Sequence, residues 1–239
     1  MRIPRIYVAQ PLALDCDVPL ETASVHYLSL VLRLKPGAPL VAFDGSGWEF
    51  SGTVVSLGKK DGVVRFTTAC EPGTESPLHT TLAIGISRGE RMDYVVQKST
   101  ELGVNLIQPL FTEHCEVRLD DKRAAKRREH WHQVAISACE QSGRVIPPLV
   151  ALPVSLQDWV GEAQGKRYLL DQTMATTPEK AANPGQLTLL IGPEGGISEN
   201  EKALALGKGF KGLNLGARTL RTETAPVVAL ALFQHLWGN

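Results

Sequence analysis

From residue 78 onward, the chain alternates short apolar segments with segments of helical spacing, and this order restricts the fold more than any other feature. The apolar segments, each expected to be a strand, occupy residues 80–87, 104–110, 168–171, 187–192 and 212–216. The intervening and final helices are expected over residues 91–103, 121–143, 198–207 and 224–237. Strands that alternate with helices are typical of an α/β domain with a mostly parallel sheet, and we predict that fold class.

Local capping signals support the expected helices. Gly103 is placed to end the first helix, whose apolar face carries Met92, Val95, Val96 and Ser99. The second helix has one face with Ala124, Trp131, Ala135 and Ala138, and a charged opposite face. Ser198 and Glu201 form a capping box at the start of the third, a feature worth about 1 kcal/mol. Pro226 fits only the first turn of the last helix, because proline lacks an amide hydrogen.

Residues 1–70 instead predict a small unit of short strands. Residues 39–57 are rich in β-forming residues, with turn residues at Asp44, Gly45 and Gly47. A hairpin that turns at Asp61-Gly62 is expected over residues 59–69. Residues 71–77, EPGTESP, have the composition of a linker. We therefore expect two domains, residues 1–72 and residues 78–239.

The charge balance neither favours nor excludes an acidic partner. The chain has 239 residues, of which 43% are hydrophobic, and carries 25 Lys and Arg against 25 Asp and Glu. A surface for nucleic acid would therefore have to be a local patch. Wide spacing without a CxxC pair favours reduced thiols at Cys16, Cys70, Cys115 and Cys139.

Neither membrane nor metal binding is indicated. The start of the chain, MRIPRIYVAQ, lacks the long apolar run of a signal peptide. The longest unbroken apolar stretch, Val227–Phe233, is too short to span a bilayer. We expect a cytoplasmic protein without a membrane partner. No metal site is expected either, since His130 and His132 lie two residues apart and would face different sides of their helix.

Two glycine-rich loops each follow an expected strand and precede a helix. They are IGPEGGISENE at residues 191–201 and LNLGARTLRTETA at residues 213–225. Open α/β sheets bind ligands at such loops, and glycine lets the main chain approach a ligand closely. Alternatively, the glycines only permit tight turns. Arg221 and Glu223 bring opposite charges to the second loop, either for a site or as a surface ion pair.

The last expected helix has almost no polar face between Val227 and Trp237. A helix that is apolar all round must be buried on most of its sides. Burial within one chain would satisfy this requirement. For a helix at the chain terminus, we favour a homodimer interface.

Several long motifs together resemble one family, the RsmE methyltransferases. The motifs are RGERMDYVVQKSTELGV at residues 88–104, RAAKRREHWHQVAISACEQSGR at residues 123–144, and both glycine-rich loops. The N-terminal segments RIPRIYV and HYLSLVLRLKPG resemble the PUA-like, RNA-binding β-barrel of that family. The resemblance implies an enzyme that uses S-adenosylmethionine to methylate N3 of a uridine in 16S rRNA of the bacterial small subunit. It also implies a homodimer and a SPOUT-type α/β catalytic domain with a trefoil knot.

The resemblance also implies site residues. The cofactor pocket would be formed by Leu170, Ile191, Gly192, Pro193, Glu194, Gly195, Gly196, Leu215, Gly216, Leu220, Arg221 and Thr222. Because uridine N3 carries a proton at neutral pH, we expect Arg221 to stabilise the deprotonated base. Glu223 would orient Arg221 or relay the proton. Residues 171–177, DQTMATT, carry no motif that assigns a role.

The expected RNA contacts are matched to family motifs: Arg5, Arg33, Arg88, Lys98 and Arg144. Some of these residues could instead hold the domains together, and Lys98 could simply pair with Glu101. Residues 118–130 hold six basic residues against three acidic ones. That segment predicts either phosphate contacts or a solvated helix face. A structured target site favours the assembled 30S subunit as the substrate.

Three alternatives remain beside this hypothesis. A nucleotide-dependent oxidoreductase would need GxGxxG after a strand, and the sequence has neither this motif nor GxxxxGK[ST]. An RNA-binding protein without catalytic activity would not need the intact GPEGG and LRTETA stretches. A methyltransferase for another RNA position is not excluded by the sequence.

Overall fold

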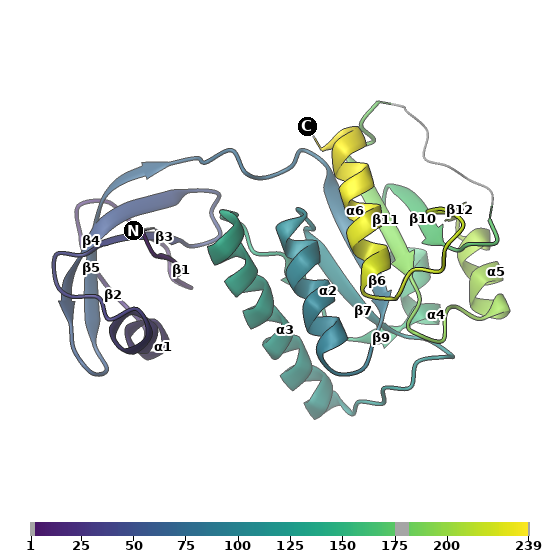
Figure 1. The fold of residues 1–239 in the computed structure, drawn as a ribbon, viewed down its shortest axis with the longest axis horizontal. Helices are drawn as coiled ribbons and strands as arrows, with labels where there is room; N and C mark the ends of the chain where they lie inside the picture. Colours follow the sequence, from purple (N-terminus) through teal and green to yellow (C-terminus); the bar gives the residue numbers. More distant parts are fainter. Residues whose placement is uncertain (1–2, 175–181, 239) are drawn as a thin grey trace. The chain divides into compact units, whose positions relative to one another are not determined.

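The computed structural model describes residues 3–174 and 182–238 and divides into two compact units (Figure 1). Residues 1–75 and 139–147 form the first unit, and residues 76–138 and 148–239 form the second. The longest helix, α3 (Asp121–Ser142), belongs mainly to the second unit. Its last turn starts at Cys139, which packs with Phe43 and Val145 in a small cluster of the first unit.

The first unit is built on a five-stranded sheet in the order β1-β3-β4-β5-β2. The parallel pair of β1 (Arg5–Tyr7) and β3 (Pro39–Phe43) is followed by antiparallel pairs through β4 (Glu49–Leu57), β5 (Gly62–Cys70) and β2 (Asp17–Pro19). The hairpin predicted at Asp61-Gly62 is confirmed, because β4 and β5 pair across the turn and the Gly58 amide donates to the Asp61 carbonyl at 2.8 Å. The turn between β3 and β4 is confirmed as well, with positive φ at Gly45 and Gly47.

The prediction that residues 1–70 contain only strands is wrong for residues 22–31. There the chain forms helix α1 (Thr22–His26) and continues in a π-helical turn, Tyr27–Val31. Val25 and Leu28 lie about one turn apart, and both are completely buried in the core of the first unit. Because that burial requires helical spacing, packing against the sheet decides the local structure.

A cluster of charged side chains ties residues 139–147 to the strands of the first unit. Arg5 pairs with Glu49 and donates to the Arg144 carbonyl at 3.1 Å. The Arg144 side chain is only 4% exposed and pairs with Glu75 at 2.7 Å. Glu75 also accepts hydrogen bonds from the amides of Val145 and residue 146. A contact of Arg5 or Arg144 with RNA would therefore require these ion pairs to open.

The second unit contains a seven-stranded sheet in which every pair is parallel, so the predicted mostly parallel sheet is confirmed. Its order is β12-β10-β11-β6-β7-β8, and β9 pairs with another part of β7. The strands are β6 (His79–Gly85), β7 (Leu106–Phe111), β8 (Leu149–Val150), β9 (Val154–Ser155), β10 (Lys166–Leu170), β11 (Gln186–Ile191) and β12 (Lys211–Leu213). The strand predicted over residues 212–216 is thus too long at its end. The Asn214 side chain accepts from the Gly216 amide at 2.8 Å, and this turn ends β12.

Helices cover both faces of this sheet, as the alternation along β11 shows. Leu189 and Ile191 pack in one cluster with residues of α2 (Glu90–Glu101), α3 and α6 (Thr224–Trp237). Leu190 packs in another cluster with residues of α4 (Leu156–Trp159), the 3-10 turn Val160–Glu162 and α5 (Glu199–Gly207). Because side chains of a strand alternate between faces, both faces of the sheet are buried (Figure 1).

The expected helices are found in the second unit, with ends that differ by a few residues. Gly103 follows the C-cap of α2 with a φ of +82°, and the faces predicted for α2 and α3 are buried. The capping box of Ser198 and Glu201 is present at the start of α5. In α6, Phe233 stacks on Tyr168 of β10 with 5.1 Å between ring centroids, and on Trp237 at 4.9 Å. These contacts fix α6 against the sheet.

All four cysteines are free, as predicted. Cys16 and Cys70 are exposed, whereas Cys115 and Cys139 are buried, and burial raises the pKa of Cys139 to about 12. Among the described residues, no helix is long and apolar enough to cross a membrane. The same part of the chain contains no group of three or more His, Cys, Asp or Glu residues that could hold a metal ion.

Substitution Glu75→Ala is expected to lower the free energy of unfolding by about 2–3 kcal/mol. It removes the Glu75 carboxylate from the buried Arg144 guanidinium, a loss of about 3–5 kcal/mol when both partners are fully buried, and Glu75 is only partly buried. Urea unfolding followed by circular dichroism measures the effect. Glu71→Ala, at an exposed position in the same segment, is the control. Equal stability of the two variants would contradict a supporting role for the pair.

Candidate functional site

The parallel pairing of β10 with β11 and β12 brings the carboxyl ends of these strands to one edge of the sheet. The loops that follow them surround a pocket of about 350 Å³, a size within the range of ligand sites. All the residues predicted to hold a cofactor line this pocket, except Gly195 and Arg221. The pocket is also lined by residues that the sequence did not assign: Asp171, Gln172, Thr173, Ile197, Leu213, Arg218, Thr219 and Ala225.

The first loop, after β10, is held by Asp171. One carboxylate oxygen accepts from the Thr173 amide at 2.7 Å and from its hydroxyl at 2.6 Å, and the other pairs with Lys202 of α5 at 2.7 Å. Burial opposes ionisation of Asp171, but the hydrogen bonds from Lys202 and Thr173 outweigh it and lower the pKa of this carboxyl. The carboxylate is therefore ionised at neutral pH. Residues 175–177 of DQTMATT lie outside the described residues.

The second loop, after β11, depends on the absence of side chains. A Cβ on Gly192 would lie 2.8 Å from the carbonyl carbon of Gly196, closer than real Cβ atoms come to other heavy atoms. The Gly196 amide donates to the Pro193 carbonyl at 2.8 Å, and Gly196 has a φ of +73°. Pro193 in turn packs directly over Gly85 at the end of β6. The glycines therefore fold the main chain back on itself at the pocket wall.

Neighbouring elements hold this second loop. Glu201 of α5 is buried and accepts from the amides of Ser198 at 3.1 Å and Glu113 at 2.9 Å. His114 Nδ1 lies 2.8 Å from the Gly195 carbonyl oxygen. Gly195, which does not line the pocket, thus faces the segment that follows β7. The loop is fixed from both sides.

The third loop separates the pocket from a second cavity. Between residues 220 and 225, Leu220, Thr222 and Ala225 line the first pocket, whereas Arg221, Glu223 and Thr224 line a cavity of about 750 Å³. The other walls of this cavity come from α2 and from Val134 of α3. The structure therefore places Arg221 beside the predicted cofactor pocket and not inside it.

Arg221 is well placed to meet a ligand that enters the second cavity. Its side chain is 83% exposed and lies 4.0 Å from Glu223. Its carbonyl accepts from the amides of Thr224 and Ala225 at 2.9 and 3.0 Å, and these bonds fix its backbone at the start of α6. An exposed cation on a fixed backbone can stabilise negative charge that develops on a ligand.

An ion pair links the walls of the two cavities. Arg91 of α2 lines the second cavity and lies 2.6 Å from Glu194, which lines the first. Burial would raise the pKa of Glu194, but hydrogen bonds from its own backbone amide, from Arg91 and from the Arg88 amide lower it. The hydrogen bond to Glu194 raises the pKa of Arg91 in turn. Both groups are therefore charged at neutral pH.

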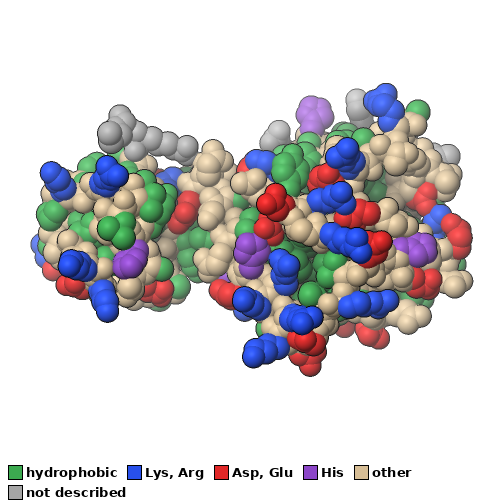
Figure 2. All heavy atoms as spheres, turned by 60° about the horizontal axis from the view of Figure 1, so that its bottom comes forward, with side chains coloured by type: hydrophobic (Ala, Val, Ile, Leu, Met, Phe, Trp, Pro, Cys, Tyr) green, Lys and Arg blue, Asp and Glu red, His purple; other side chains and the backbone are tan. Residues whose placement is uncertain are grey.

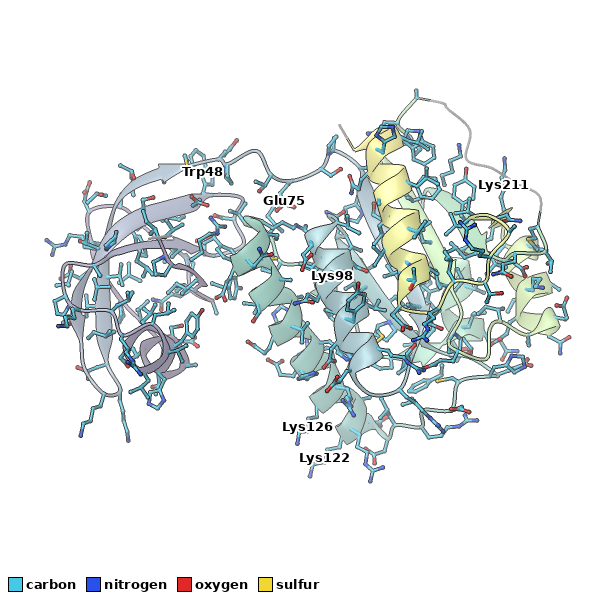
Figure 3. All side chains as sticks on the ribbon, in the orientation of Figure 1. Trp48, Glu75, Lys98, Lys122, Lys126 and Lys211 are labelled. Atoms are coloured by element: carbon cyan, nitrogen blue, oxygen red, sulfur yellow. The ribbon has the colours of Figure 1, made fainter. Side chains whose placement is uncertain are left out.

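The residues predicted to contact RNA are divided between the two units. Arg33 is exposed and adopts a positive φ of 52° in the first unit, and Arg88 of the second unit is exposed and pairs with Glu116 at 2.8 Å. Lys98 pairs with Glu101 at 2.7 Å, as the alternative reading of the sequence allowed. Lys122 and Lys126 project from the start of α3 (Figure 3). Figure 2 shows Lys and Arg side chains interspersed with acidic ones, in agreement with the balanced charge of the chain.

The sequence did not reveal that residues 171–173 line the pocket, because this segment carries no glycine and matches no trusted motif. One signal was available, since Asp171 directly follows an apolar strand at the same edge as the two glycine loops. The contribution of α2 to the second cavity had no such signal. It depends on the packing of α2 and α3 against the start of α6.

Comparison with known proteins identifies the family. Residues 74–234 match the family described as RNA methyltransferase domain, and residues 20–67 match the RNA methyltransferase PUA domain. The chain is 35% identical to ribosomal RNA small subunit methyltransferase E of Synechocystis over 97% of this chain and 77% of that protein. It is 32% identical to the protein of the same name in Buchnera aphidicola from Acyrthosiphon pisum, over 100% of this chain and 95% of the other. The chain belongs to the ribosomal RNA small subunit methyltransferase E family.

Solved structures agree with this assignment. A putative methyltransferase from Legionella pneumophila, in complex with S-adenosylmethionine, is 39% identical and superposes with a TM-score of 0.96 over 100% of both chains. Ribosomal RNA small subunit methyltransferase E from Neisseria gonorrhoeae, also bound to S-adenosylmethionine, is 37% identical with a TM-score of 0.93 over 99% of both chains. The α/β fold with an N-terminal PUA domain is therefore that of the family.

Substitution Gly192→Ala is expected to displace the second loop and to weaken binding of S-adenosylmethionine at least tenfold. The added Cβ would meet backbone atoms of Gly196 and Ile197, which cannot move without reshaping the pocket wall. Isothermal titration measures the affinity. Gly207→Ala is the matched control, because a Cβ there meets no atom within 4 Å and φ is not positive. Unchanged affinity of Gly192→Ala would show that the loop does not shape the binding site.

Substitution Lys202→Met is expected to make binding of S-adenosylmethionine sensitive to pH between 7 and 5. In the unchanged protein the pKa of Asp171 lies below its ordinary value of 3.8, so the carboxylate stays ionised and its contribution is lost only as the pH falls through that lowered pKa. Without Lys202, burial is opposed by the hydrogen bonds from Thr173 alone, so the pKa of Asp171 rises.

Titration calorimetry at pH 7 and pH 5 compares the two proteins, with a loss of about threefold in affinity expected only for the variant. Glu199→Ala removes the other, exposed partner of Lys202 and should leave the pH dependence unchanged. Parallel pH profiles for Lys202→Met and the unchanged protein would contradict the role of this pair.

Proposed function

We propose that this protein transfers a methyl group from S-adenosylmethionine to N3 of one uridine in 16S rRNA of the bacterial small ribosomal subunit. The observation that carries the proposal is the pocket of the three loops, with the Arg221 cavity beside it. Two relatives that match this chain over almost its whole length are described as bound to S-adenosylmethionine. The family name indicates small-subunit rRNA as the substrate. The resemblance to the RsmE motifs indicates N3 of a uridine as the methylated atom.

The pocket residues fit S-adenosylmethionine in size and in charge. When bound, this cofactor supplies a methyl group activated by a positively charged sulfur. The pocket offers the carboxylates of Asp171 and Glu194 and the guanidinium of Arg218, which suit a ligand with both positive and negative groups. Apolar side chains of Leu170, Leu215 and Leu220 and the backbone of the glycine loops enclose the remainder.

Arg221 and Glu223 carry the chemistry of the target base in this proposal. Loss of the N3 proton leaves negative charge on the uracil oxygens, and Arg221 stabilises that charge because its guanidinium is always protonated. Glu223 lies close enough to orient Arg221 and offers a carboxylate that can accept the proton. The target base must leave any Watson–Crick pair, since pairing buries N3.

RNA is held, in this proposal, by the PUA domain and by basic residues of the catalytic domain. Along the chain we propose residues 1–72 and 78–239 as the two domains, with residues 139–147 of the second packing against the first. Arg33, Arg88, Lys122 and Lys126 are the exposed basic residues that we assign to phosphate contacts. Arg5, Arg144 and Lys98 act first as supports, since each is engaged in an ion pair that is at least half-buried, whereas the pair of Arg88 with Glu116 is exposed. The substrate is the assembled 30S subunit in the cytoplasm, because a preformed site costs less ordering entropy.

Two chains form a homodimer through α6 in this proposal. Val228 and Ala231 lie exposed on a helix whose opposite side packs against the sheet, and exposed apolar positions on a largely apolar helix favour association. The trefoil knot stays a prediction from the RsmE resemblance.

The activity is tested by incubating the protein with labelled S-adenosylmethionine and 30S subunits that lack their own N3-methyluridine. Mass spectrometry then locates the label. Label on N3 of one uridine of 16S rRNA is the expected result. Cofactor binding without any label on this RNA would contradict the proposed substrate, and label on another nucleotide would reassign the position.

Substitution Arg221→Ala is expected to lower kcat by about 10²–10³-fold, the usual effect of removing one group that stabilises developing negative charge. The affinity for S-adenosylmethionine should stay within about threefold, because the Arg221 side chain lies outside the cofactor pocket. Lys211→Ala removes an exposed cation from another part of the same unit and serves as the control (Figure 3). Near-normal turnover of folded Arg221→Ala would contradict the assigned role.

A further inference from the structure

We infer that the cavity between α2, α3 and the start of α6 is the binding site of the target uracil, with Tyr94 as its stacking surface; this inference rests on the proposed function. The cavity of about 750 Å³ is lined on the α2 side by Glu90, Arg91, Asp93, Tyr94 and Gln97. No family motif or comparison assigns a ligand to these side chains. Their position beside Arg221 makes them the natural surroundings of the base.

Tyr94 has the exposure and the setting of a base-stacking residue. It is 45% exposed, although the residues beside it along the helix, Val95 and Val96, are completely buried. Lys98 Nζ lies 6.0 Å from its ring centroid, so a cation already engages this ring. An exposed aromatic ring at the wall of a cavity binds any base by stacking, whatever its sequence context. Tyr94 therefore supplies affinity for a base that has left its helix.

The charges of the cavity favour a nucleobase over a phosphate. Three carboxylates line it, those of Glu90, Asp93 and Glu223, against the two guanidinium groups of Arg91 and Arg221. Arg91 is already paired with Glu194. A phosphate would meet an excess of negative charge, whereas a neutral base with both donors and acceptors would meet partners for each. The phosphates of the RNA must therefore lie outside this cavity.

The same groups favour uracil over cytosine. Uracil presents the N3 hydrogen between two carbonyl oxygens, so it requires an acceptor flanked by donors. Glu223 supplies the acceptor, and Arg221 together with the Gln97 amide supplies donors. Within the described residues, neither the side-chain amide of Gln97 nor the Tyr94 hydroxyl has a hydrogen-bond partner. Cytosine would turn the lone pair of its N3 toward the Glu223 carboxylate, and the two acceptors would repel each other. A site that matches the donors and acceptors of uracil therefore disfavours cytosine.

The position of the cavity also suits methyl transfer. Residues 220–225 form one wall of each cavity, with alternate residues facing the two sides, and the ion pair of Arg91 and Glu194 joins the opposite walls. A base held beside Tyr94 and Arg221 therefore lies next to the wall that the two cavities share, and its N3 must reach past residues 220–225 to meet the methyl group. Reacting groups bound in adjoining pockets gain the rate advantage of fixed orientation.

Four proteins test the inference: the unchanged protein, Tyr94→Ala, Tyr94→Phe and Leu206→Ala. Leu206 is the matched control, because it is an exposed large residue on α5 (42% exposed) outside both cavities. For methylation of 30S subunits, Tyr94→Ala should lower kcat/KM about tenfold or more, the effect expected for loss of one stacked base. Tyr94→Phe keeps the ring and should stay within threefold of the unchanged protein, as should Leu206→Ala.

A second measurement does not depend on turnover. Saturation-transfer NMR with the protein saturated with S-adenosylhomocysteine should show contact to the uracil protons of uridine 5′-monophosphate and a weaker signal for cytidine 5′-monophosphate. Tyr94→Ala should abolish the uridine signal, and Leu206→Ala should retain it. Equal signals for both nucleotides, or a uridine signal that survives Tyr94→Ala, would overturn the inference.

Cofactor affinity and light scattering complete the test. Tyr94→Ala should bind S-adenosylmethionine within about twofold of the unchanged protein and should keep its oligomeric state. A changed oligomeric state would show that a second copy covers the cavity and would overturn the inference. If the unchanged protein does not methylate 30S subunits but the NMR pattern is as expected, the proposed substrate fails while the uracil site stands.

Discussion

The parallel pairing of β10 with β11 on one side and β12 on the other is the constraint on which the candidate site depends. Parallel strands end at the same edge of a sheet, so three loops far apart in the sequence must meet there. Each loop is then closed by a local device of a different kind. Asp171 pairs with Lys202, Gly192 lies against Gly196 without a side chain between them, and Asn214 turns the chain at Gly216. None of these devices would form a pocket without the common edge.

The segment at the start of α6 forms a wall of the cofactor pocket and of the second cavity beside it. Stacking of Tyr168, Phe233 and Trp237 fixes the helix on the sheet, and the Arg221 carbonyl accepts from its first amides. The short segment before the helix is therefore held in a conformation that presents alternate residues to two cavities. Cofactor and base can then be held by neighbouring residues of one segment, which keeps the charged groups for the base out of the cofactor pocket.

Local sequence signals predicted the longer elements of the second unit well, but they did not predict β8, β9 or α4. The spacing in α2, the capping box of Ser198 and Glu201, and the glycine loops each depend on residues close together in the chain, and each is present. The first unit was predicted less well, since α1 forms where strands were expected. Val25 and Leu28 are buried there against a sheet whose strands come from other parts of the chain, and no local pattern reports that packing.

The sequence by itself determined the α/β class and the glycine loops, because strand and helix periodicities and turn residues act over a few positions. Most of the pocket residues came from the resemblance of its motifs to the RsmE family. Only the tertiary structure decided that Asp171 joins the pocket, that Arg221 faces a separate cavity walled by α2, and that Arg144 is buried against Glu75. These placements depend on strand order and helix packing, which bring together residues 30 to 130 positions apart. The chemical type of each side chain is visible in the sequence. Which distant residues it contacts depends on how the whole chain folds.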